Sequence, residues 1–255
     1  MAEPARQIDR IDVAPRFTEA DALRLNARFA GIPTLEMLRA VLAEKLTGET
    51  AIVSSFGAES AALLHLVASV DRSVPVLFLD TGKHFPETLA YRDLLVERLG
   101  LTDFRNLSPD PALLAKRDAT ELRWSYDPDG CCEIRKVLPL DAGLAGIDAT
   151  ITGRKAFQAS TRAALPRFEL DGERLKINPL ADWSKADLDA YFEVHALPAH
   201  PLVAQGYLSI GCAPCTSIVK PGEDPRAGRW RGWDKTECGI HTPTSDDDDA
   251  NQPVF

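Results

Sequence analysis

The chain has 255 residues, of which 45% are hydrophobic and 26% are charged, as in a globular protein with a sizeable core. Its formal net charge of -9 argues against nucleic acid as a partner, because duplex binding requires a basic face. No apolar run approaches the roughly 20 residues that span a bilayer, and the first residues lack the order of a signal peptide. We therefore expect a cytoplasmic protein with reduced cysteines and no membrane partner.

The N-terminal part, residues 18–47, is predicted to form two helices. Apolar positions at helical spacing cover residues 18–29, with Thr18 as the N-cap, and a second apolar face covers residues 34–46. Gly48 ends the second helix. These two helices are candidates for packing between the subunits of a homo-oligomer.

After residue 50 short apolar strands alternate with helices. This order predicts an α/β fold, with a parallel sheet flanked by helices on both faces. In such sheets ligands lie beyond the carboxyl ends of the strands. The expected strands cover residues 51–56, 74–79, 102–107 and 149–152, and the expected helices cover residues 58–70 and 86–99.

Three of these strands end in loops that could bind an anion. Residues 54–60 open a helix, so their backbone N–H groups could hold phosphate, although small residues in such turns also serve purely conformational roles. Residues 79–84 could hold a base or a sugar, and residues 152–162 carry guanidinium groups suited to phosphate. The candidate ligand-binding residues are Ser54, Ser55, Phe56, Gly57, Ala58, Glu59, Ser60, Leu79, Asp80, Thr81, Gly82, Gly153, Arg154 and Arg162.

The second half of the chain is less regular. Residues 126–130 read as a turn before a helix that begins at Cys131, and residues 167–178 read as a β-hairpin. Ser184 is expected to cap a helix that continues to about residue 195. From residue 221 the chain is rich in glycine, proline and charge. We therefore divide it into an α/β domain, residues 1–220, and a flexible C-terminal segment, residues 221–255.

Four of the five cysteines form two pairs, Cys131-Cys132 and Cys212-x-x-Cys215. In a reducing compartment such pairs indicate metal or redox chemistry, and four thiolates suit either zinc or an iron–sulfur centre. Around one zinc ion the sulfurs converge to within roughly 3.8 Å of each other. Tandem cysteines meet that demand poorly because adjacent side chains diverge, whereas in a [4Fe-4S] cluster each thiolate binds a different iron. The spacing favours the cluster, with structural zinc as the alternative.

The fifth cysteine, Cys238, has no cysteine neighbour and follows a stretch rich in arginine, which includes Arg226 and Arg229. Another basic pair, Arg135-Lys136, lies one helical turn after Cys131. Clustered cations in an acidic chain suggest a small, multiply charged anion as ligand, although any one cluster can also be solvated surface charge. Four paired cysteines and one single cysteine predict four metal ligands and one nucleophile.

These motifs closely resemble the assimilatory adenylyl-sulfate (APS) reductases of bacteria, over residues 51–241. The resemblance rests on the tandem cysteines with the basic pair after them, the distant Cys212-x-x-Cys215, and the terminal Glu-Cys-Gly-Ile-His at 237–241. It implies a [4Fe-4S] cluster on Cys131, Cys132, Cys212 and Cys215, and an adenine-nucleotide alpha-hydrolase-like fold related to the ATP pyrophosphatases. The loop at 54–60 departs from the Ser-Gly-Gly-x-Asp pattern of those enzymes, so ATP hydrolysis is not expected.

The resemblance also implies a reaction, in assimilatory sulfate reduction and cysteine biosynthesis. The Cys238 thiolate would attack the sulfur of APS and displace AMP, leaving S-sulfocysteine on the enzyme. Lys136, Arg226, Arg229 and His241 would offset the developing negative charge. Thioredoxin would then release sulfite and supply two electrons. Residues 221–232 would act as the hinge of a lid over the substrate.

Three other interpretations remain open. A reductase that prefers the 3'-phosphorylated substrate PAPS, or accepts both substrates, shares the terminal motif but generally lacks the four paired cysteines. An iron–sulfur redox sensor or a zinc-stapled binding module would have Cys238 as a bystander. An adenylating or sulfurtransferase enzyme of the same fold would consume ATP, which the altered loop disfavours.

Overall fold

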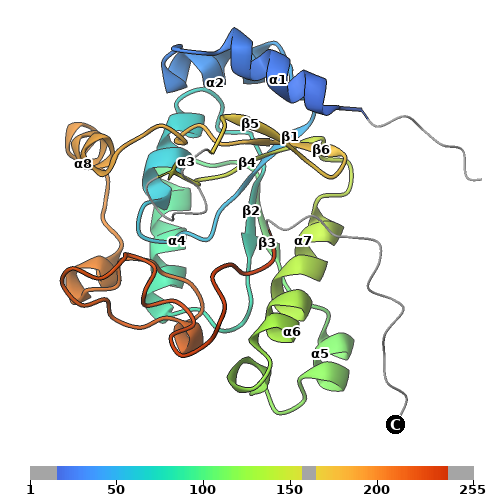
Figure 1. The fold of residues 1–255 in the computed structure, drawn as a ribbon, viewed down its shortest axis with the longest axis vertical. Helices are drawn as coiled ribbons and strands as arrows, with labels where there is room; N and C mark the ends of the chain where they lie inside the picture. Colours follow the sequence, from blue (N-terminus) through green and yellow to red (C-terminus); the bar gives the residue numbers. More distant parts are fainter. Residues whose placement is uncertain (1–15, 157–164, 241–255) are drawn as a thin grey trace, which may run out of the picture.

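The computed structural model describes residues 16–156 and 165–240, and it confirms the predicted α/β class. The described residues form one six-stranded sheet with the strand order β3-β2-β1-β4-β6-β5, flanked by helices (Figure 1). The strands are β1 (Thr50–Val53), β2 (Val76–Leu79), β3 (Phe104–Leu107), β4 (Ala149–Ile151), β5 (Phe168–Asp171) and β6 (Arg174–Ile177).

The central strand of the sheet is β1, which lies between β2 and β4. Ile52 of β1 pairs in parallel with Val76 of β2 and with Ile151 of β4. β3 and β6 extend the parallel sheet outward, and β5 adds an antiparallel edge as the first strand of the predicted hairpin. Because the chain places β2 on one side of β1 and β4 on the other, a crevice is expected at the carboxyl ends of β1 and β4.

The helices cover both faces of the sheet. α3 contacts α4 and α8, whereas α7 contacts β2 and β3, and α1 lies against β5 (Figure 1). The helices are α1 (Glu19–Arg28), α2 (Thr34–Ala43), α3 (Ser60–Ala68), α4 (Pro86–Leu99), α5 (Pro111–Arg117), α6 (Pro128–Cys132), the π-helix η2 (Glu133–Val137), α7 (Leu138–Gly143) and α8 (Lys185–Val194), with 3₁₀ turns η1 (Arg123–Ser125), η5 (Pro201–Gln205) and η6 (Ala213–Cys215).

Local signals in the sequence explain where several helices begin and end. Thr18 and Ser184 form capping boxes at the starts of α1 and α8. α4 begins at Pro86 and ends before Gly100, which has φ = 62°. Within the part of the chain that the structure describes, no helix is long and apolar enough to cross a membrane.

Two expectations about local structure were wrong. Residues 128–130 are not a turn before a helix but the first turn of α6, because the Asp127 side chain accepts a hydrogen bond from Gly130 N at 2.8 Å and Pro128 occupies the first position. The second helix ends at Ala43 rather than at residue 46, because Lys45 already has φ = 48°.

Candidate functional site

A cavity of about 640 Å³ opens at the carboxyl ends of β1 and β4. It is lined by the loop after β1, by the end of β2, by the loop after β4, and by part of the C-terminal segment. The structure thereby brings together most of the predicted ligand-binding residues: Ser54, Ser55, Gly57, Ala58, Glu59, Ser60, Leu79, Lys136, Gly153, Arg154, Arg226, Arg229 and Cys238.

Other predicted residues lie elsewhere. Asp80, Thr81 and Gly82 do not line this cavity, and the Thr81 side chain faces Cys212 instead, with 3.3 Å between Oγ1 and Sγ. Arg162 and His241 are outside the described residues. The loop after β2 therefore belongs mainly to the cysteine region described below.

Phe56 contributes to the cavity through the backbone that it anchors. Its ring is fully buried and makes edge contacts with Phe78 and Phe104, at centroid distances of 5.5 and 6.0 Å. Its φ of 48° is unusual for an aromatic residue. Such strain persists where the surrounding packing determines it, and here it turns the chain so that Gly57 and Ala58 line the cavity.

Several lining residues were not predicted as site residues. Lys155 is 2% exposed, its ammonium donates to the Gly153 carbonyl at 2.8 Å, and it pairs with Glu59 at 2.9 Å. Lys155 stands next to Arg154 in a basic pair, which is a signal that could have identified it. Ile210 and Gly211 line the cavity because the chain that leads into Cys212 passes its rim, and no local motif announces that approach.

The cavity is more cationic than the chain as a whole. Among its described lining residues, basic side chains outnumber acidic ones, in a protein with a net charge of -9. Such a surface attracts an anionic ligand. The basic residues are Lys136, Arg154, Lys155, Lys185, Arg226 and Arg229, and the acidic residues are Glu59, Asp189 and Glu237.

Arg229 reaches the cavity over a glycine. A Cβ atom on Gly211 would lie 2.3 Å from the Arg229 guanidinium, so a larger residue there would displace this side chain. The guanidinium also packs on the ring of Trp230, with 4.4 Å from Cζ to the ring centroid. A β-bridge between Arg229 and Thr216 joins this part of the C-terminal segment to the second cysteine pair.

Cys238 is half-buried in the wall of the cavity. The residues before it are held in place, because Arg226 Nη2 donates to the Thr236 carbonyl at 2.6 Å and to Glu237 at 3.1 Å. After it, Ile240 packs against a small apolar cluster formed by β1, β2 and α7, so that the segment returns to the sheet. These contacts place the thiol among the basic side chains.

The other four cysteines line a second, smaller cavity together with Lys83, Arg135 and Lys136. Cys131 and Cys132 come from α6, whereas Cys212 caps the start of the turn η6 and Cys215 ends it. The loop after β2 meets that turn, because Ala213 N donates to the Lys83 carbonyl at 2.7 Å and His84 forms a β-bridge with Cys212. The fold thus unites two cysteine pairs that lie about eighty residues apart in the sequence.

The four thiols form a donor set suited to a multi-iron centre. Burial raises the pKa of Cys131 to about 12 and that of Cys132 to about 11, helped by the neighbouring thiols, so a bound cation must replace these protons before the sulfurs are thiolates. Within residues 16–156 and 165–240, no three Cys, His, Asp or Glu side chains are grouped as one metal ion requires. Four thiols around one cavity are soft donors that suit either zinc or an iron–sulfur centre.

Lys136 lines both cavities. Burial would lower the pKa of its ammonium, but the negative charge available on Cys212, Cys238 and Cys132 outweighs burial, and the pKa is raised. The same contact acts on Cys212, where burial opposes ionisation but Lys136 and the Thr81 hydroxyl outweigh it and lower the thiol pKa. Lys136 is therefore a permanent cation between the paired cysteines and Cys238.

The mostly parallel sheet, flanked by helices and with a cationic cavity beyond its central strands, is that of an adenine-nucleotide alpha-hydrolase-like fold. Residues 49–218 match the family described as the phosphoadenosine phosphosulfate reductase domain, and the chain belongs to this family.

Individual relatives agree with this assignment. The adenosine 5'-phosphosulfate reductase of Mesorhizobium japonicum is 53% identical over 241 residues, which are 94% of this chain and 94% of the relative. The phosphoadenylyl-sulfate (PAPS) reductase from Candida auris, solved as a phosphate complex, has a TM-score of 0.67 at 25% identity and covers 80% of this chain and 98% of its own. Candida glabrata FMN adenylyltransferase shares the fold, with a TM-score of 0.52 at 14% identity over 80% and 75% of the two chains.

Proposed function

We propose that this chain is a thioredoxin-dependent reductase that converts adenosine 5'-phosphosulfate (APS) to sulfite and AMP. The observation that carries the proposal is the position of Cys238, a thiol in the wall of a cationic cavity at the carboxyl ends of β1 and β4. The relative in Mesorhizobium japonicum that is named for this substrate matches nearly the whole chain. The proposed activity places the protein in sulfate assimilation and cysteine biosynthesis in the cytoplasm.

The first step is a nucleophilic substitution at sulfur. The Cys238 thiolate forms an S–S bond to the sulfuryl sulfur of APS while the S–O bond to phosphate breaks, and AMP leaves. Negative charge then grows on the phosphate oxygen. Lys136 and Arg229 line the cavity on the side of Cys238, where fixed cations stabilise this charge. The loop after β1, at the start of α3, supplies backbone N–H groups for the phosphate.

The second step removes the sulfonate group from Cys238. A thiolate of reduced thioredoxin attacks the Cys238 sulfur, sulfite leaves, and a mixed disulfide forms. The second thiol of the partner resolves that disulfide and returns the Cys238 thiolate. The dithiol of the partner is thereby oxidised by two electrons, and the sulfur of the substrate is reduced to sulfite.

We further infer that Cys131, Cys132, Cys212 and Cys215 hold a [4Fe-4S] cluster. A bound cluster would supply a fixed charge next to the side chains that line the cysteine cavity. Lys136 and Arg135 are the basic side chains that line the cysteine cavity from η2, and they offset that charge. Lys136 thereby keeps its ammonium near Cys238.

A second candidate substrate is PAPS. The family is described by the phosphorylated substrate, and the solved relative from Candida auris is named for it. The four paired cysteines and the relative in Mesorhizobium japonicum favour APS.

Sulfite release by anaerobically purified protein, with reduced thioredoxin and either APS or PAPS, tests the proposal. We expect turnover with APS to exceed turnover with PAPS. The absence of sulfite from both substrates, in protein that contains its iron, would reject the reductase and favour the redox-sensor alternative.

A further inference from the structure

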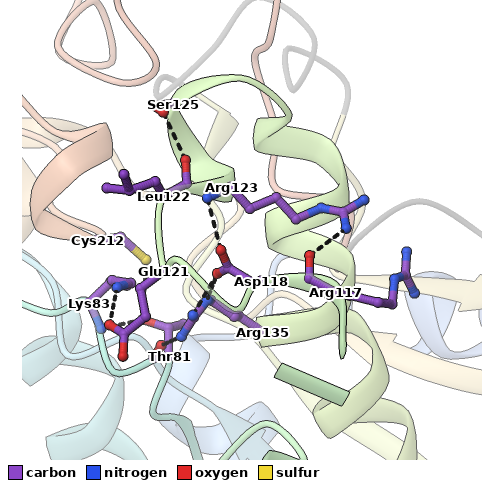
Figure 2. Close-up of polar contacts among 10 residues, drawn as sticks. All are labelled: Thr81, Lys83, Arg117, Asp118, Glu121, Leu122, Arg123, Ser125, Arg135 and Cys212. Atoms are coloured by element: carbon purple, nitrogen blue, oxygen red, sulfur yellow. Dashed lines mark hydrogen bonds and ion pairs between the residues drawn. The ribbon is translucent and has the colours of Figure 1, made fainter. Parts of the chain in front are cut away.

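The segment of residues 117–127, here called the clamp segment, leads from the end of α5 to α6 and carries Asp118, which faces Arg135 (Figure 2). The Asp118 side chain is 0% exposed and pairs with Arg135, whose side chain is 5% exposed. Asp118 Oδ2 accepts from Arg135 Nη2 at 2.6 Å and from Nε at 3.2 Å, while Oδ1 accepts from Arg123 N at 2.9 Å. Both carboxylate oxygens are therefore used.

The bound guanidinium reaches the loop after β2. Arg135 Nη1 donates to the Thr81 carbonyl at 2.8 Å, and the Thr81 hydroxyl lies 3.3 Å from the Cys212 sulfur (Figure 2). Ala213 N donates to the Lys83 carbonyl at 2.7 Å. A continuous chain of polar contacts thus runs from Asp118 to the turn that carries the second cysteine pair.

This series of polar contacts joins two structural units that no strand or helix joins directly. Arg135 lies on η2, which continues from α6 and its cysteines, whereas Cys212 and Cys215 belong to a separate turn. A buried ion pair contributes little net stability when it is compared with apolar packing, but removing one partner leaves an uncompensated charge. In this structure the ion pair orients Arg135. A planar guanidinium that is held by a carboxylate can direct its remaining N–H donors in only one way.

A neighbouring ion pair makes a useful contrast. Lys83 and Glu121 also connect the clamp segment to the loop after β2, at 2.7 Å, but the Glu121 side chain is 72% exposed. Exposed pairs contribute little to stability or geometry. We therefore expect removal of the buried pair to have a larger effect than removal of the exposed pair, although both pairs involve the clamp segment.

We propose that Asp118 is a positioning residue that sets the separation of the two cysteine pairs, by holding Arg135 against the Thr81 carbonyl before metal is loaded. The proposal rests on the assignment of the four paired cysteines as cluster ligands under the proposed function. It assigns to the clamp segment a role in assembling and retaining the cluster, distinct from the role of Cys238 in the reaction.

The test compares Asp118→Asn with Glu121→Gln, which removes the exposed pair, and with Asp171→Asn, which removes a charge from the Lys176–Asp171 pair on the distant β5–β6 hairpin, where Lys176 is buried. Iron and sulfide per chain, the visible absorption of the anaerobic protein, and the rate of iron loss to a chelator are measured. We expect Asp118→Asn to lose iron about tenfold faster or more, as outer-shell changes at metal sites do. The two controls should lose iron at the wild-type rate.

Asp118→Glu keeps the charge and should lie between wild type and Asp118→Asn in the rate of iron loss. If Asp118→Asn fails to fold, Asp118→Glu serves as the test variant. The proposal is overturned if the Asp118 variants lose iron at the wild-type rate, or if Asp171→Asn accelerates the loss equally, since the effect would then be one of general stability.

Metal-free protein supplies an independent readout. We expect alkylation of Cys212 by iodoacetamide, read by peptide mass, to be faster in Asp118→Asn than in wild type, relative to Cys238 in the same sample. An unchanged ratio would count against the positioning role. If the wild-type chain binds no iron at all, the cluster assignment fails, and the alkylation ratio still decides whether Asp118 positions the thiols.

Discussion

The two cavities differ in how they are built. The larger cavity, which is the proposed substrate cavity, is lined by loops that leave the ends of parallel strands, so its position follows from the sheet. The cysteine cavity is small and lies between a helix and a separate turn, and we propose that polar contacts from the clamp segment hold it together. Lys136 lines both. The topology of the sheet therefore positions the larger cavity, whereas we propose that individual side chains position the cysteine cavity.

The largest expected effect separates chemistry from binding in the substrate cavity. Cys238→Ser removes the nucleophile, and we expect turnover to fall by about 10⁴-fold or more, as for other catalytic nucleophiles. Calorimetry should show AMP binding to the variant with the wild-type affinity. Sulfite release near the wild-type rate would mean that another thiol carries the reaction.

Lys136→Met should affect both cavities at once. Because the ammonium is fixed near Cys238 and the paired cysteines, we expect kcat to fall by about 10²- to 10³-fold, together with faster loss of iron. Lys116→Met is the matched control, because Lys116 lies on α5 and lines neither cavity. Equal effects of the two variants would contradict a special position for Lys136.

Gly211→Ala should affect the substrate cavity alone. The added methyl group occupies the space of the Arg229 guanidinium, so we expect KM for APS to rise by about tenfold, the equivalent of one charge-assisted hydrogen bond. Arg229→Ala should raise KM similarly, and the double variant should add little to either change. Fully additive effects would show that Gly211 acts without Arg229.

The smallest effect concerns stability and leaves both cavities intact. His200 is 1% exposed, and burial lowers its pKa to about 4 from 6.5. The neutral ring is favoured in the folded chain, so its contribution to stability is complete above pH 6.5 and is lost as the pH falls toward 4. We expect a loss on the order of 3 kcal/mol over that range.

Urea unfolding at several pH values checks this expectation. His200→Asn should be less stable overall, because it loses the contact between the ring and the Thr88 hydroxyl at 3.1 Å, but its stability should depend less on pH. An unchanged pH dependence would assign the effect to other groups, such as His65 and His84, whose pKa values burial also lowers.

Regular features of the sequence were sufficient to predict the sheet and the general place of the substrate cavity. The apolar run at 51–56 overlaps most of β1, the run at 74–79 contains β2, and the capping residue Ser184 marks the start of α8. Strand periodicity indicates which segment is buried. It does not state how far a strand continues, and β1 ends at Val53 because the chain turns at Phe56.

Sequence patterns do not predict contacts between segments that are distant in the chain. Nothing near Asp118 in the sequence indicates that it will meet Arg135, or that Thr81 will face Cys212 rather than the substrate cavity. The approach of Arg229 to Gly211 is of the same kind. These pairings depend on the packing of loops whose own patterns are irregular, so they appear only when the chain is folded.

The central claim is that Cys238 attacks the sulfur of APS, and a single-turnover experiment tests it most directly. Protein is mixed anaerobically with APS in the absence of thioredoxin, and AMP release is followed together with the mass of the peptide that carries Cys238. We predict one AMP released per chain and one sulfonate group on Cys238, which reduced thioredoxin then removes as sulfite. Sulfite released without thioredoxin, or a sulfonate group found on another cysteine, would contradict the account.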